Sequence, residues 1–188
     1  KIAPYDANLL APLIVRWPGK VPADTRSIVP VNGVDLVRTF HSLAGIEPAE
    51  KLDGRDLTEL LLHPETPGWD DRPMLQTYTG NIYGEKQMVE ELKKAHKTGD
   101  WKKFITHSTG IKAWLMVRQG KYKYIRYIYK DYLDELYDME ADPEELFNLA
   151  VRPEFHGIKM EMRRLLTDEL KKTGVSFLPL LPEPIQPY

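Results

Sequence analysis

The 188 residues of this chain are enough for a domain with a buried core. Lys and Arg number 26 against 28 Asp and Glu, so the net charge of −2 predicts no general attraction to nucleic acid or to anionic membranes. The absence of cysteine excludes a disulfide framework, a thiolate zinc site and a cysteine nucleophile. No apolar run approaches the ~18 residues of a membrane span.

The first residues, KIAPYDANLLAPLIVRWPGK, do not have the pattern of a chain start, because they lead directly into an apolar run at 13–17. Such a run between prolines is typical of a strand buried on both faces. We therefore expect a strand that has lost its neighbours in a larger sheet. Its exposed edge predicts self-association of the chain.

A helix is predicted within VNGVDLVRTFHSLAGIEP, where apolar residues recur at helical spacing. Asn32 and Asp35 form an N-cap pair at its start, and Gly45 ends it. A short helix follows around Leu57 to Leu61, and a strand is expected at 74–78. The charged stretch 80–106 predicts two surface helices divided at Gly99.

The strongest β pattern is a pair of alternating runs, 112–118 and 121–129, around Gln119 and Gly120. It predicts an antiparallel hairpin, with ELYDM as a third strand. Tyrosines of this hairpin fit either core packing or a sugar-stacking platform. A basic run in the same hairpin indicates a solvated sheet face; it consists of Lys121, Lys123, Arg126 and Lys130.

The acidic stretch DMEADPEE predicts a turn and a helix start, with Asp142 as the cap. A long amphipathic helix is expected at 153–172, followed by an extended proline-rich tail. The whole pattern predicts two pieces. Residues 1–69 form the end of an α/β domain, and residues 70–188 form an α+β subdomain whose antiparallel sheet is packed by a long helix.

Residue chemistry alone assembles no active site. The sequence has no phosphate-binding glycine loop and no nucleophile motif, and its five histidines show no metal-ligand spacing. No metal site is expected in the chain. His107 stands out because it lies in the polar loop ITHSTG, which joins the charged stretch to the hairpin.

Three segments in order resemble the C-terminal part of the type I sulfatases, within the alkaline phosphatase superfamily. They are KIAPYDANLLAPLIVRWPGKVPADT, VDLVRTFHSLAGIEPAEKLDGRDL and WLMVRQGKYKYI followed by ELYDMEADPEELFNLA. The resemblance covers about residues 1–166. It implies that the chain is a fragment, excised or cleaved from a longer enzyme, or else a degenerate homologue.

The family hydrolyses sulfate esters with a formylglycine nucleophile and a calcium ion, while basic residues bind the sulfate oxygens. The motif that yields formylglycine and the calcium ligands would precede this chain, so the fragment alone should be inactive. By position in the family motif, Lys1 is the sulfate-binding lysine. The resemblance makes His107 a candidate for contacting the sugar, with Trp101 and Lys102 ranked after it.

The resemblance implies a sulfated carbohydrate as the substrate of the full-length enzyme and a periplasmic, secreted or lysosomal location. Two alternatives stay open. One is a phosphonate monoester hydrolase or phosphodiesterase of the same superfamily, and the other is a non-catalytic glycan-binding module.

Overall fold

The computed structural model describes residues 2–69 and 71–187, which form two compact units. Residues 11–74 make one of them, here called the 11–74 unit. The C-terminal unit combines the segment up to Leu10 with the chain from Leu75 onward. Residues 2–10 therefore pack with a part of the chain that is distant in the sequence. The domain boundary predicted at residue 69 concerns the fold of the longer protein, and it stays a prediction.

Two helices form the 11–74 unit, α2 (Gly33–Ala44) and α3 (Thr58–Leu62). The predicted start and end of α2 are confirmed. The Asn32 side chain accepts a hydrogen bond from the Asp35 backbone N–H, and the Asp35 carboxylate accepts one from the Asn32 N–H. Gly45 ends the helix at a φ of +67°, a left-handed conformation that glycine adopts without strain.

A close backbone approach explains the glycine in the LDGR stretch of the 11–74 unit. Gly54 lies so near the carbonyl group of Val34 that a Cβ at this position would collide with it. The backbone N–H of the next residue, Arg55, donates to the buried carboxylate of Asp35 at 2.8 Å. This loop is thereby tied to the first turn of α2.

The run at 13–17 is not a strand in this structure, so the prediction of a buried strand there is wrong for the chain by itself. Ile14 is 90% exposed, and no described strand pairs with the run. A strand needs neighbours for its backbone hydrogen bonds.

The predicted apolar stripe of α2 is also open to solvent at Val37 and Phe40.

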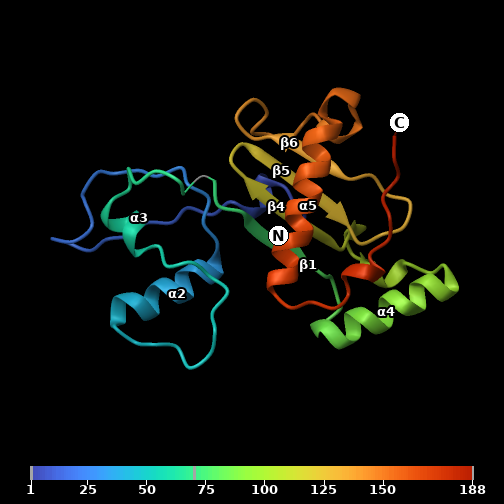
Figure 1. Cartoon of the computed structure of the whole chain (residues 1–188), viewed down its shortest axis with the longest axis horizontal. Coiled ribbons are helices and arrows are strands. Elements are labelled where there is room, and N and C mark those ends of the chain that lie inside the picture. Colours follow the sequence, from blue (N-terminus) through green and yellow to red (C-terminus); the bar gives the residue numbers. More distant parts are fainter. Residues whose placement is uncertain (1, 70, 188) are drawn as a thin grey trace. The chain divides into compact units, whose positions relative to one another are not determined.

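A four-stranded sheet forms the centre of the C-terminal unit, in the order β1-β4-β5-β6 (Figure 1). The strands are β1 (Met74–Tyr78), β4 (Trp114–Gln119), β5 (Tyr122–Tyr127) and β6 (Glu135–Asp138). The hairpin of β4 and β5 is antiparallel, as predicted, and pairs Gln119 with Tyr122 across a two-residue turn. A separate antiparallel pair is made by β2 (Ile105–Thr106) and β3 (Ile111–Lys112).

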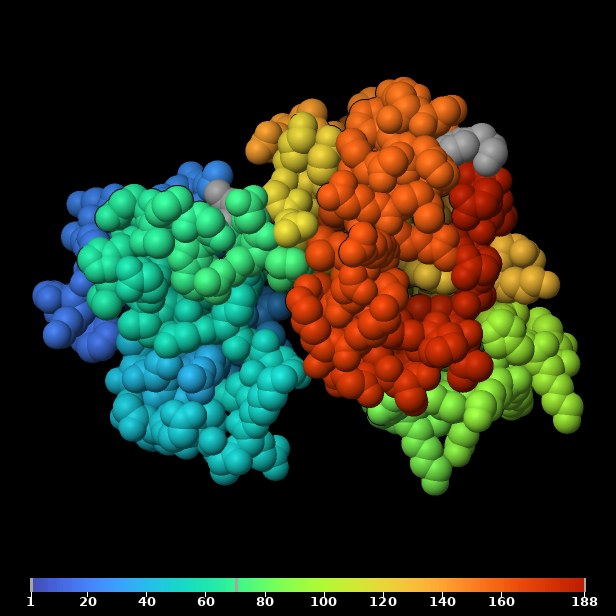
Figure 2. Space-filling view, in the orientation of Figure 1, coloured from blue at the N-terminus to red at the C-terminus, as the bar shows by residue number. Residues whose placement is uncertain are grey.

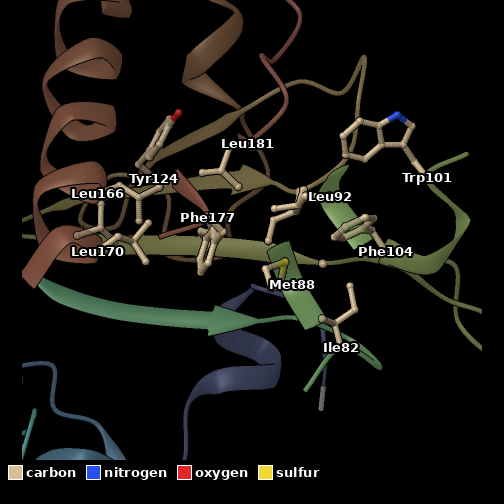
Figure 3. Close-up of a cluster of buried hydrophobic side chains, with 14 of the residues drawn as sticks. Ile82, Met88, Leu92, Trp101, Phe104, Tyr124, Leu166, Leu170, Phe177 and Leu181 are labelled. Carbon is tan, nitrogen blue, oxygen red and sulfur yellow. The ribbon is translucent and has the colours of Figure 1, made fainter. Parts of the chain in front are cut away.

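The long predicted helix is confirmed as α5 (His156–Lys172), preceded by the 3-10 turns η2 (Leu149–Val151) and η3 (Pro153–Phe155). Figure 1 shows α5 lying across the sheet. Its buried residues Leu166 and Leu170 belong to one hydrophobic core with Tyr124 of β5 (Figure 3). An antiparallel sheet covered by a helix gives the α+β architecture that the sequence predicts.

Further elements complete this core. In the stretch 80–106 the structure has one α-helix, α4 (Gly84–Thr98), and the 3-10 turn η1 (Lys102–Phe104), where two helices were predicted. Met88 and Leu92 of α4 enter the core (Figure 3). The tail contains the 3-10 turn η4 (Leu178–Leu180), and Figure 2 shows it in red against the orange-red surface of α5.

The acidic stretch after β6 forms turns, so the predicted helix start there is wrong. Asp142 does act as a cap, since its carboxylate accepts hydrogen bonds from the backbone N–H groups of Leu146 and Phe147. Glu145 adopts a φ of +57°, which is strained for a residue other than glycine and breaks a helix.

Candidate functional site

The sheet of the C-terminal unit has two different faces. Tyr124 and its same-face neighbours point into the core under α5. Because side chains alternate along a strand and cross-strand partners share a face, the register defines the opposite face. That second face carries Trp114, Met116, Arg118, Lys123, Ile125, Tyr127, Glu135 and Tyr137.

The segment 2–10, which contains the one-turn helix α1 (Asp6–Leu9), covers this second face. The Trp114 indole N–H donates to the carbonyl oxygen of Ile2 at 2.8 Å. The Tyr5 hydroxyl donates to the Glu135 carboxylate at 3.2 Å. These contacts explain why β4 and β5 are buried on both faces, and why charged side chains lie inside the unit.

Glu135 accepts hydrogen bonds from three tyrosine hydroxyls, with Tyr127 at 3.0 Å and Tyr137 at 3.1 Å in addition to Tyr5. Burial raises the pKa of the Glu135 carboxyl above its ordinary value, and the three hydroxyl donors offset part of that rise. Burial also raises the pKa of all three tyrosines, so they are protonated donors at neutral pH.

A second charged group lies on the same face, beside Asp6. The Lys123 ammonium is 2.8 Å from Asp6 Oδ1 and 2.7 Å from Glu145 Oε1, and its side chain is fully buried. The Asp6 backbone N–H donates to the other carboxylate oxygen of Glu145 at 2.5 Å. Arg118 pairs with Asp6 at 3.7 Å. The prediction that Lys123 lies on a solvated face is therefore wrong, and so is that for Arg126, which is 6% exposed.

Lys1 itself lies outside the described residues. Ile2, which follows it, meets Trp114, and the Trp114 ring centroid lies 6.0 Å from that of Tyr78. The Tyr78 hydroxyl is 2.7 Å from the hydroxyl of Thr106, the residue before His107. The structure thus joins the neighbours of Lys1 and His107, far apart in sequence, through one pair of aromatic side chains.

The predicted contact residues occupy different environments. His107 is exposed in the turn between β2 and β3, and Lys102 is exposed at the start of η1. Trp101 is only 4% exposed and packs in the core against Phe104 (Figure 3). Its ring also contacts that of His96. A sugar needs an open aromatic face, so Trp101 is assigned a packing role. Tyr124 and Tyr127 are buried as well and offer no sugar platform.

Within residues 2–69 and 71–187, no three His, Cys, Asp or Glu side chains are grouped as metal ligands would be. The resemblance places the calcium ligands before this chain, so no metal chemistry is assigned to the described residues. In the same part of the chain, none of the helices combines the length and the apolar character that a bilayer span demands.

Sequence reasoning missed the charged residues of the second face. Lys123 and Glu135 each stand among apolar and aromatic residues in strands, where a regular alternation would have placed them on a buried face. This alternation indicates burial of Lys123 and Glu135 only when both faces of the hairpin are known to be covered. The partner segment lies more than a hundred residues away in the sequence.

Comparison with known proteins identifies relatives for nearly the whole chain. The family model described as N-sulphoglucosamine sulphohydrolase, C-terminal, matches residues 1–116 and 87–172. A Δ4,5-hexuronate-2-O-sulfatase of Bacteroides thetaiotaomicron is 33% identical over 90% of this chain and 30% of its own length. An N-acetylglucosamine-6-O-sulfatase of the same organism is 26% identical over 89% of this chain and 26% of its own length.

A solved structure also shares the fold. It is described as a complex with its substrate D-glucosamine-2-N,6-O-disulfate, and it aligns with a TM-score of 0.64 at 22% identity. The alignment covers 85% of this chain and 28% of that protein. The chain thus spans less than a third of the length of each of these three relatives.

Replacing Glu135 by Gln tests the electrostatics of the second face. The folded chain binds a proton at Glu135 more readily than the unfolded chain does, because burial raises the folded-state pKa. The stability contributed by Glu135 is therefore present in full below its ordinary pKa of 4.5 and is lost as the pH rises through the folded-state value. We expect the free energy of unfolding of the wild-type chain, taken relative to that of Glu135→Gln, to increase as the pH falls from neutrality toward 4.5.

Urea unfolding across this pH range measures the difference, and Glu140→Gln, at an exposed residue after β6, is the control for the loss of one carboxylate. A difference that instead grows as the pH rises would contradict the expectation.

Proposed function

Since this chain belongs to the family described as N-sulphoglucosamine sulphohydrolase, C-terminal, we propose that the full-length protein hydrolyses sulfate esters of carbohydrates. The observation that carries the proposal is the family match, which spans both the Lys1 segment and the hairpin. Relatives named for sulfatase activity on hexuronate and N-acetylglucosamine support a sugar as the substrate.

Lys1 is the residue of this chain proposed to touch the sulfate group. A lysine ammonium is a compact charge that can approach two sulfate oxygens, and it stabilises the negative charge that these oxygens carry in the transition state. A formylglycine and a calcium ion, contributed by residues outside this chain, would supply the nucleophile and a Lewis acid. The chain alone is then expected to be inactive.

The turn that carries His107 is proposed to line the substrate cleft. Support comes from the contact chain that runs from Ile2 through Trp114 and Tyr78 to Thr106. An exposed turn at the tip of a two-stranded ribbon can reach a sugar beyond the sulfate group. Lys102 is a second candidate on the same stretch of chain, because its side chain is exposed.

Sulfated polysaccharides lie mostly outside the cytoplasm, so we propose a periplasmic, secreted or lysosomal location for the full-length protein. The relatives named as sulfatases favour sulfate over phosphonate esters as substrates. A phosphonate monoester hydrolase and a non-catalytic glycan-binding module remain as outcomes of the experiments below.

The reaction class is tested by assaying the full-length protein with an aryl sulfate and with a phenyl phosphonate monoester. We expect the higher kcat/KM for the sulfate, and a fall of about 10²- to 10³-fold in that value for Lys1→Ala, as for loss of a group that stabilises an oxyanion. Faster turnover of the phosphonate would assign the alternative enzyme class. Glycan binding without turnover of either ester would assign the binding module.

The role of His107 is tested by comparing two sulfate esters of different size. His107→Ala should raise the KM for a sulfated disaccharide about tenfold, equivalent to about 1.4 kcal/mol of lost contact, and should leave the KM for an aryl sulfate nearly unchanged. The control is His63→Ala, which removes an exposed histidine of the 11–74 unit. Equal effects of both variants would argue against a contact between His107 and the sugar.

We further propose that the isolated chain self-associates through the apolar side chains of the 11–74 unit. Ile14, Ile28 and Phe40 of this unit are 90%, 82% and 64% exposed, and large apolar side chains left open to solvent can form an association surface. Light scattering should give an average mass above that of one chain, and Phe40→Ser should lower it. Met160→Ser, at a 42% exposed residue of α5, is the control. A monodisperse monomer at all concentrations would refute this proposal.

A further inference from the structure

The segment that follows Lys1 is held to the second face of the sheet at three successive points. Its backbone is bound at Ile2 by Trp114, and its side chains at Tyr5 and Asp6 are bound by Glu135 and Lys123. α1 has no fully buried residue, whereas Pro4 before it is buried and the Tyr5 ring packs edge-on against that of Tyr137, so polar contacts act together with apolar packing. Hydrogen bonds and ion pairs are directional, and they hold a short segment in one register more strictly than apolar packing does.

The Lys123 ammonium is the centre of this attachment. It lies between the carboxylates of Asp6 and Glu145 and has no exposed surface. Burying three charges is costly, and well-packed apolar residues of similar size often stabilise a fold as well or better. Stability alone therefore does not account for this arrangement.

The backbone of Glu145 is a second indication that these contacts hold the segment 2–10 in one position. Its backbone is held at a φ of +57°, in a region that non-glycine residues rarely adopt. In that conformation its carboxylate reaches both the Lys123 ammonium and the Asp6 backbone N–H. Strain of this kind persists only where the surroundings require it, and it occurs often at functional sites.

We propose that Asp6, Lys123 and Glu145 are positioning residues for Lys1, an inference that rests on the proposed function. They fix the segment 2–10 on the sheet, and the fixed segment sets where the lysine that precedes it meets the sulfate group. Lys123 and Glu145 thereby take part in sulfate binding, through a lysine that is distant from them in the sequence.

The variant of choice is Asp6→Asn in the full-length protein. It keeps the shape of the side chain and an acceptor oxygen, while Lys123 retains Glu145 as its ionic partner. Lys123→Met would leave the buried Glu145 carboxylate without its cation and could prevent folding. The matched control is Glu183→Gln, which weakens the ion pairs of the tail with Arg126 and Arg163 without touching the segment 2–10.

The decisive measurement is a double-mutant cycle with Lys1→Ala. Asp6→Asn should lower kcat/KM for a sulfate ester about 10- to 100-fold, as expected for a misplaced binding group, and should weaken inhibition by inorganic sulfate by a similar factor. In the Lys1→Ala background the same substitution should change kcat/KM less than about twofold, because the residue through which it acts is gone. Glu183→Gln should leave both readouts near wild type.

The outcomes separate the inference from the function on which it rests. Equal losses from Asp6→Asn in both backgrounds, or a loss without weaker sulfate inhibition, would show that the network acts only on folding and would overturn the positioning role alone. Unchanged hydrolysis in Lys1→Ala would remove the proposed role of Lys1 and the positioning role with it. Circular dichroism and thermal unfolding of each variant identify any loss of fold.

Discussion

The C-terminal unit depends on a lysine ammonium that has no access to water. Lys123 stands on strand β5, and two carboxylates that are 139 residues apart in the sequence, Asp6 and Glu145, meet at its side chain. A buried charge without partners would cost about 3–5 kcal/mol, which is a large share of the stability of a small domain. The sheet, the first residues and the loop after β6 must therefore come together in one arrangement, or the lysine cannot be buried at all.

The opposite face of the sheet combines apolar packing with a second polar cluster. Tyr124 donates a hydrogen bond to Asp134, and the Arg126 guanidinium donates to the carbonyl oxygen of Pro182 in the tail. The pKa of the Tyr124 hydroxyl is raised by burial and by the Asp134 carboxylate, so it serves as a donor at neutral pH. The tail is thus tied down by polar contacts beside the apolar core, just as the first residues are on the other face.

This construction separates two tasks within the C-terminal unit. The helix α5 and the core below it stabilise the sheet, and the second face of the sheet holds the segment 2–10, mainly through side chains that are half-buried. The 11–74 unit is different, since its helix α2 is well capped but leaves Val37 and Phe40 open to solvent. The caps of α2 come from within this unit, whereas these apolar side chains of α2 stay exposed.

Local patterns were sufficient for much of the fold. Asn32, Asp35 and Gly45 defined α2, because caps act through neighbours a few residues away. Alternation around Gly120 defined the hairpin, and the apolar stripe defined α5. The run at 13–17 failed as a strand because strand formation depends on partners that lie elsewhere. Glu145 was placed in a helix because its propensity gave no sign of a distant ion pair.

The candidate site shows the same division. By itself, the sequence determined the family resemblance, the motif position of Lys1 and the exposed loop of His107. Only the tertiary structure decided that Trp101 is a core residue and that Lys123 is buried. It also decided that Ile2 and Thr106 meet at Trp114 and Tyr78. The reason is physical: propensity and periodicity act over a few residues, while burial and charge pairing depend on which distant segment covers each face of the sheet.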